Sequence, residues 1–144
     1  MVKRKPLTAQ GWEILFQKFD PRPASVLHRR EGRAEEWFHA ASVGEWETLV
    51  PIVEKRLNAD HSIAISFFSP SAQDHVDRWF KKQSELHRQK IVFIGFSPKE
   101  GEWESVLEAY HVRKIIVTRY EAWPSLWVAA SRLQIHLVII NAEQ

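Results

Sequence analysis

The stretch EWFHAASVGEWETLVPIVEKRL, residues 36–57, decides the fold of this chain. Residues 36–40 form a short, mostly apolar run, which is typical of a buried strand. Apolar side chains then recur at helical spacing, at Leu49, Val50, Ile52, Val53 and Leu57. This spacing predicts a helix with one apolar face. A strand that runs directly into an amphipathic helix indicates an α/β protein.

Glu45 falls in the first turn of this predicted helix. The helix dipole and the free backbone N–H groups favour the ionised form of a carboxylate at that position. An ionised carboxylate is what a general base needs near neutral pH. Alternatively, Glu45 only complements the dipole, with Ser42 as the N-cap of the helix. The motif by itself leaves both interpretations open.

Apolar runs and helical stretches alternate from about residue 35 onward. The expected strands cover residues 37–40, 63–68, 91–94, 114–118 and 136–141, and the expected helices cover residues 45–58, 71–86, 102–111 and 124–133. Runs of Val, Ile and Phe without polar alternation indicate strands that are covered on both faces. We therefore expect a Rossmann-like α/β fold, a mostly parallel sheet of about five strands with helices on both faces.

The composition is that of an ordinary globular chain: 144 residues suit one domain, with 44% apolar and 26% charged residues. Cysteine is absent, which excludes disulfides and thiolate metal sites. No apolar run is long enough to span a membrane, and the first residues lack the apolar core of a signal peptide. We expect a cytoplasmic protein.

Positive charge is concentrated at the N-terminus, where residues 1–33 hold eight Lys or Arg against three acids. The aromatic and aliphatic residues Trp12, Leu15, Phe16 and Phe19 share one face of a predicted helix over residues 8–19. A basic helix with such a face could anchor the protein to an anionic membrane or pack on its own domain. Binding of nucleic acid is disfavoured, because the aromatic residues do not alternate with basic ones. We assign residues 1–34 to this helix and a linker, and residues 35–144 to the Rossmann-like domain.

Polar residues follow the expected strands at the edge where α/β proteins bind ligands. They are Ser42 and Gly44 beside Glu45, Ser69 and Ser71 after the second strand, and Arg119 and Glu121 after the fourth. Helix N-termini at this edge could hold a phosphorylated or carboxylated ligand. No glycine-rich nucleotide loop, HExxH pair or nucleophile elbow occurs, so we expect neither a nucleotide cofactor nor a metal. His39 could orient a ligand, although a lone histidine at a strand end more often has a structural role.

Three motifs together resemble the N-terminal half of the Kdo (3-deoxy-D-manno-octulosonic acid) transferases. These are WFHAASVGE at residues 37–45, EAWPSL at residues 121–126 and IINA at residues 139–142. The segment Phe68-Ser69-Pro70 is also similar to the family's second strand end. The resemblance spans residues 36–142, and the three motifs in this order are far more specific than any one alone.

The resemblance implies one half of a GT-B glycosyltransferase, whose two Rossmann-like halves face each other across a cleft. The half seen here would hold the acceptor, a lipid A precursor at the inner membrane, with Ser42, Gly44, Ser69, Ser71, Arg119 and Glu121 as candidate contacts. The second half would bind the donor, CMP-Kdo. Glu45 would deprotonate the acceptor hydroxyl, which then displaces CMP with inversion.

The chain departs from the family pattern in three ways. Arg119 stands where family members usually carry an acid, the apolar N-terminal anchor of many members is missing, and the sequence stops at Gln144, before any donor domain. Two functions therefore stay open. The chain is the acceptor-binding half of a Kdo transferase, inactive alone and peripheral on the inner membrane, or a non-catalytic lipid or membrane-surface binding module derived from that fold.

Overall fold

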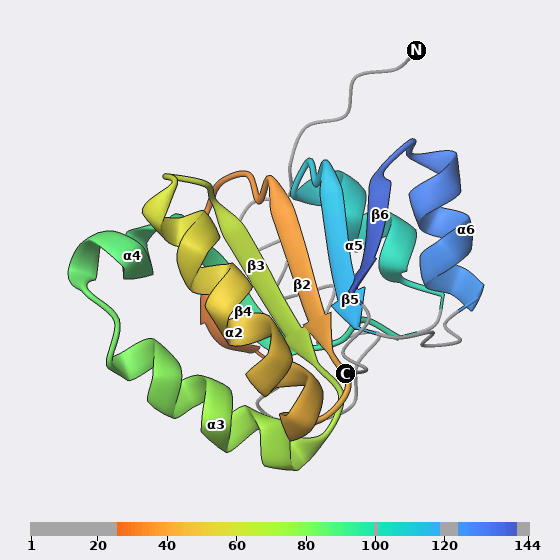
Figure 1. The fold of residues 1–144 in the computed structure, drawn as a ribbon. Helices are drawn as coiled ribbons and strands as arrows, with labels where there is room; N and C mark the ends of the chain where they lie inside the picture. The colour runs from red at the N-terminus through yellow and green to blue at the C-terminus, as the bar shows by residue number, and fades with distance from the viewer. Residues whose placement is uncertain (1–25, 100, 119–123, 141–144) are drawn as a thin grey trace.

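The six strands of the sheet lie in the order β1-β4-β3-β2-β5-β6 (Figure 1). Their bounds are β1 (Val26–Arg29), β2 (Glu36–Ala40), β3 (Ile63–Phe67), β4 (Ile91–Phe96), β5 (Lys114–Thr118) and β6 (His136–Ile140). The computed structural model describes residues 26–99, 101–118 and 124–140, and these counts refer to them. β1 runs antiparallel to β4, and all other neighbouring strands are parallel. The mostly parallel sheet predicted from the apolar runs is confirmed.

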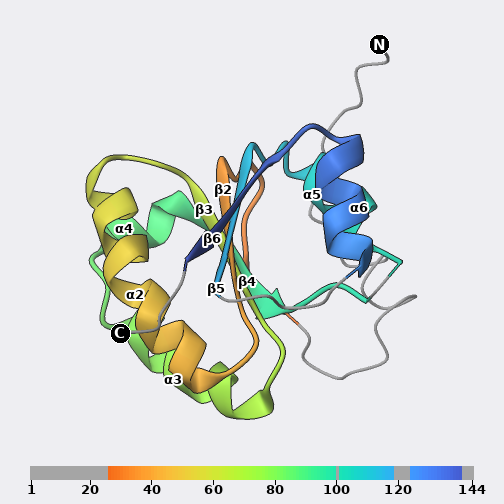
Figure 2. The same ribbon diagram turned by 45° about the vertical axis from the view of Figure 1, so that its right-hand side comes forward.

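Helices cover both faces of the sheet in the described part of the chain, as Figure 2 shows with the sheet seen nearly edge-on. The helices are α2 (Val43–Asn58), α3 (Pro70–Lys81), α4 (Glu85–Lys90), α5 (Trp103–Ala109) and α6 (Pro124–Arg132). α2 and α3 pack on one face, and α5 and α6 pack on the other. Two helical layers around a central sheet are the Rossmann-like α/β architecture that the sequence predicts.

Side chains of β2 alternate between two apolar cores, one on each face of the sheet. Trp37 belongs to the core under α5 and α6, whereas Phe38 and Ala40 belong to the core under α2 and α3. All five residues of β2 are buried. Because both faces of the strand are covered, it has no need of an exposed polar side, which explains its continuous apolar pattern.

Strand β1 is absent from the pattern-based prediction, which assigns residues 26–34 to the N-terminal segment. In the structure, Val26–Arg29 pairs with β4 at the outer edge of the sheet. An edge strand that is only half-buried carries polar residues such as His28 and Arg29, so it shows no apolar run. The predicted helix over residues 8–19 lies outside the described residues.

The sequence pattern predicts one helix over residues 71–86, but the structure has two. α3 ends at Lys81, where the N–H of Lys82 bonds to carbonyl groups of the last turn. Ser84 then starts α4, and its hydroxyl accepts a hydrogen bond from the N–H of His87 at 3.1 Å. A serine N-cap therefore restarts the helix in a new direction, a signal that the continuous amphipathic pattern conceals.

Candidate functional site

The carboxyl ends of β2 and β5 lie side by side at the point where the strand order reverses. From β2 the chain proceeds through α2 to β3 on one side, whereas β5 pairs with β2 on the other side. Figure 1 shows the arrowheads of these strands at the same end of the sheet, where α2 begins. Open α/β sheets bind their ligands at such a reversal.

Glu45 projects from the first turn of α2 at this reversal. The hydroxyl of Thr118, the last residue of β5, donates a hydrogen bond of 2.7 Å to Glu45 Oε1. The hydroxyl of Ser42 lies 3.1 Å from Glu45 Oε2 and donates to it. Thr118 is fully buried, whereas Glu45 is partly exposed. The carboxylate is thus fixed by two elements that are 73 residues apart in sequence.

Neutral groups, and no cation, hold Glu45 in the described part of the chain. Each hydroxyl donates one hydrogen bond, and no Lys, Arg or His nitrogen of the described residues lies within 4.0 Å of its oxygen atoms. A carboxylate that is hydrogen-bonded to neutral donors keeps lone pairs for a further donor. This arrangement suits a group that accepts a proton from a ligand hydroxyl.

Ser42 is the N-cap of α2, as the sequence predicts. Its side chain accepts a hydrogen bond from the N–H of Glu45 at 3.4 Å. The same hydroxyl also contacts the Glu45 carboxylate, so capping and positioning of the carboxylate occur together. The two interpretations of Glu45 are therefore compatible in geometry: it lies at the positive end of the helix and also faces the edge of the sheet.

The turn after β3 is joined to the turn after β2 by backbone hydrogen bonds. The N–H of Phe68 bonds to the carbonyl of Ala40 at 3.3 Å, and the N–H of Ser69 bonds to the carbonyl of Ala41 at 3.0 Å. Ser69 therefore lies beside the residue that precedes Ser42. The polar segments that follow β2 and β3 converge in the structure.

Ser69 caps α3, with Pro70 in the first helical position. Its hydroxyl lies 2.7 Å from the hydroxyl of Ser71 and accepts a hydrogen bond from the N–H of Ser71 at 3.3 Å. Both serines are exposed. Gly44 is also exposed, and a Cβ built there would meet nothing within 4 Å. Arg119 and Glu121 lie outside the described residues.

Thr118 is a site residue that the sequence pattern misses. It ends an apolar strand, and its only signal is a hydroxyl after the run Ile-Ile-Val. Its importance comes from the pairing of β5 with β2, which brings it next to Glu45. The order of strands in a sheet cannot be read from the local sequence, so the contact is visible only in three dimensions.

His39 lies inside the fold and not at the exposed edge. Its Nδ1 is 2.8 Å from the hydroxyl of Ser66, which also accepts a hydrogen bond of 2.8 Å from Trp37 Nε1. The imidazole meets the ring of Trp103 edge-on, with 5.5 Å between ring centroids. Burial lowers the pKa of His39 to about 4, so the ring is neutral near pH 7. These contacts give it a structural role.

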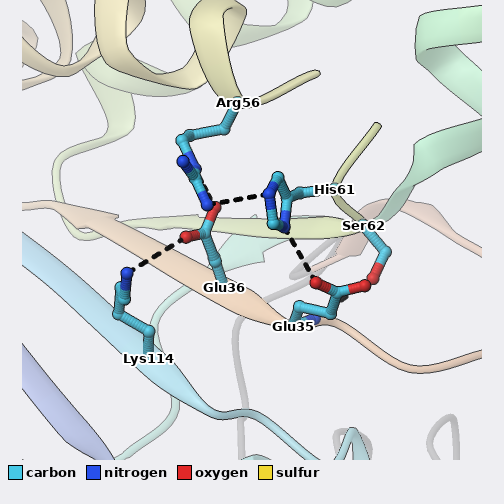
Figure 3. A network of polar contacts seen from close by, with 6 residues as sticks. All are labelled: Glu35, Glu36, Arg56, His61, Ser62 and Lys114. Atoms are coloured by element: carbon cyan, nitrogen blue, oxygen red, sulfur yellow. Dashed lines mark hydrogen bonds and ion pairs between the residues drawn. The ribbon is translucent and has the colours of Figure 1, made fainter. Parts of the chain in front are cut away.

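A second polar network lies at the opposite end of β2 (Figure 3). Glu36 is buried and bonds to Arg56 Nε at 2.8 Å, and Lys114 Nζ lies 3.7 Å from its other oxygen atom. Arg56 also donates to His61 Nε2 at 2.9 Å. Because an arginine can only donate, His61 must carry its proton on Nδ1, which donates to Glu35 at 2.8 Å. This network joins the amino ends of the strands and the end of α2.

Within the described ranges, no three His, Asp or Glu side chains gather in a group that could hold a metal ion. Nor is any helix there both long and apolar enough to cross a membrane. The chemistry that the described residues offer at the carboxyl ends of the strands is therefore that of one carboxylate and several hydroxyl groups.

Comparison with known proteins agrees with the resemblance seen in the motifs. The profile of a family described as "3-Deoxy-D-manno-octulosonic-acid transferase (kdotransferase)" matches residues 15–143. A 3-deoxy-D-manno-octulosonic acid transferase of Aquifex aeolicus (strain VF5) is 31% identical over 106 residues. That alignment covers 74% of this chain and 27% of the relative, so the chain corresponds to a minor part of that protein.

Proposed function

The chain belongs to the Kdo transferase family, as its N-terminal domain, and we propose that it is the acceptor-binding half of a glycosyltransferase. The complete enzyme would transfer Kdo from CMP-Kdo to a lipid A precursor in lipopolysaccharide biosynthesis. The observation that supports this function best is the position of Glu45. Its carboxylate lies where the strand order reverses, and only hydroxyl groups of the described residues bond to its side chain.

Glu45 would act as the general base of the transfer. It takes the proton of an acceptor sugar hydroxyl while that oxygen attacks the anomeric carbon of Kdo. The bond from Kdo to CMP breaks, CMP leaves with the bonding electrons, and attack from the opposite face inverts the configuration. The hydrogen bonds from Ser42 and Thr118 would hold the carboxylate in place for this step.

The acceptor would lie along the edge formed by the turns after β2 and β3. Gly44 leaves open space beside Glu45, and the exposed hydroxyl groups of Ser69 and Ser71 can bond to a sugar or phosphate oxygen. Arg119 and Glu121 complete the proposed acceptor contacts. An arginine among them would suit a phosphate group of the acceptor.

CMP-Kdo would bind to a second Rossmann-like domain that faces this one, as in GT-B enzymes, so this chain alone would not turn over. The acceptor is a membrane lipid, and the basic N-terminal residues would be attracted to an anionic surface. We propose that the protein acts at the cytoplasmic side of the inner membrane, where it is peripherally bound.

The test measures CMP release from CMP-Kdo with a lipid A precursor as acceptor, in the natural protein that contains this chain. Replacing Glu45 by Gln should lower the rate by about 10²- to 10⁴-fold, the usual contribution of a general base. The variant should fold normally, because the side chain is partly exposed and of the same size.

Glu47→Gln is the matched control, since Glu47 is an exposed carboxylate on the same helix. It should leave the rate unchanged within about twofold, as expected for an exposed position. A Glu45→Gln variant that retains more than about a tenth of the rate would contradict the proposal. If the unmodified protein binds the lipid but releases no CMP, the chain is the non-catalytic binding module.

A further inference from the structure

A hollow of about 580 Å³ opens at the outer edge of the sheet, between β1, the end of α3 and α4. It is lined by His28, Arg30, Phe80, Glu85, Arg88 and Gln89. α4 leads into the first residue of β4, whereas Glu45 follows the last residue of β2. The hollow therefore lies at the opposite end of the parallel sheet from Glu45, as the position of α4 in Figure 1 shows. It is separate from the proposed catalytic site.

A bulge in β1 turns His28 toward this hollow. Val26 packs against the core under α5, and Leu27 packs against the core under α2. Simple alternation would return His28 to the α5 side, but the register between β1 and β4 shifts at this point. The ring of His28 instead lies against Phe80 of α3, with 4.5 Å between ring centroids. Bulges commonly redirect a side chain in this way near functional sites.

The hydrogen bond of His28 defines what the ring can offer a ligand. Its Nε2 lies 2.8 Å from the carbonyl oxygen of Ile91, so this nitrogen must carry a proton and donate. The pKa of His28 is lowered, first by burial and further by the positive charge of Arg30. In the neutral ring, Nδ1 is therefore a hydrogen-bond acceptor at the side of the hollow.

Two guanidinium groups in the lining have no carboxylate partner among the described residues. Neither Arg30 nor Arg88 takes part in an ion pair there, and Arg88 makes only a 3.4 Å hydrogen bond to the carbonyl of Lys81. Glu85 supplies the one acid in the lining. Two cations against one carboxylate give the hollow a net positive charge, which favours an anionic ligand.

We propose that this hollow binds a phosphorylated sugar. The two guanidinium groups suit the oxygen atoms of a phosphate, which arginine binds through paired N–H donors. Glu85 and His28 Nδ1 can accept hydrogen bonds from sugar hydroxyl groups, and the ring of Phe80 offers an apolar surface to the C–H face of the sugar. The volume lies within the range of small-molecule sites. The proposal does not depend on the transferase activity.

The test titrates the 144-residue chain with glucose 6-phosphate, inorganic phosphate and glucose at constant ionic strength, by calorimetry. Glucose 6-phosphate should bind in a saturable way and more tightly than either of the other two. Arg30→Gln and Arg88→Gln should each weaken its binding by roughly tenfold or more, because each removes a charge-assisted hydrogen bond. Both side chains lack ion pairs in the described residues, so the fold should be preserved.

Arg78→Gln is the matched control, because Arg78 is exposed on α3 but does not line the hollow. It should leave the affinity unchanged. Phe80→Leu should reduce the affinity for glucose 6-phosphate toward that for inorganic phosphate. The proposal is overturned if glucose 6-phosphate binding does not saturate, if inorganic phosphate or glucose binds equally well, or if Arg78→Gln causes the same loss as the two lining variants.

Discussion

Two carboxylates stand at the two ends of the same strand, and their surroundings differ. Glu36 begins β2, is 4% exposed, and is held by the cations Arg56 and Lys114. Glu45 follows β2, is partly exposed, and is held by the hydroxyl groups of Ser42 and Thr118. A carboxylate between two cations is committed to stability, whereas one held by neutral donors can still accept a proton. The chain thus separates a structural acid from a chemically available one.

His39 tests the buried middle of the same strand and carries the largest expected effect on stability. Its pKa of about 4 lies below the ordinary value of 6.5, because burial disfavours the charged ring. Below pH 6.5 the unfolded chain therefore binds a proton that the folded chain does not bind. Stability attributable to this residue should fall from pH 6.5 to about 4, by up to about 3 kcal/mol.

Urea denaturation of the unmodified chain and of His39→Asn across this pH range measures the effect. The variant cannot titrate at this position, so the difference in unfolding free energy between the two proteins should shrink as the pH falls. Parallel pH profiles would show that His39 is not held neutral by the fold.

Replacing Glu36 by Gln should destabilise the fold by about 2 kcal/mol, because Arg56 and Lys114 lose their shared carboxylate. The effect is kept below that of a fully buried ion pair because both cations are partly exposed to solvent. Glu45→Gln should change the unfolding free energy by less than about 1 kcal/mol, since it removes no ion pair in the described residues. Equal losses in urea denaturation would erase the distinction between the two ends.

Thr118→Val sharpens the comparison at the end where Glu45 lies. The substitution keeps the shape of a buried side chain but removes the 2.7 Å hydrogen bond to Glu45. The rate of CMP release in the natural protein should fall about tenfold, as expected for one lost hydrogen bond to a charged group. The fall should be in kcat, with KM for the lipid A precursor little changed. A variant with the unmodified rate would show that Thr118 does not position the carboxylate.

The two serine N-caps give the smallest expected effect. Ser42→Ala and Ser69→Ala should each lower the unfolding free energy by about 1 kcal/mol, the usual value of a cap. In the assay of CMP release, Ser42→Ala should reduce the rate more than Ser69→Ala, because only Ser42 donates to Glu45. The opposite order would assign the larger contribution to the turn after β3.

The sequence predicts the parallel sheet and its helices because buried parallel strands leave an unbroken apolar pattern. Ser42 as a cap and the position of Glu45 in the first turn of α2 follow from local spacing alone. The strand β1 and the break between α3 and α4 escape that reading, since a half-buried edge strand and a helix restart leave weak local signals. The contact between Glu45 and Thr118 depends on strand order, which short-range patterns do not contain.

The two backbone hydrogen bonds between the turns after β2 and β3 restrict how this edge of the molecule can evolve. Since Phe68 and Ser69 bond to Ala40 and Ala41, a single-residue insertion or deletion in either turn would shift the other one out of alignment. Side chains at the mouth can be exchanged freely, but the loop lengths cannot. Diversification of ligand preference at this edge should therefore proceed by substitution and not by changes in length.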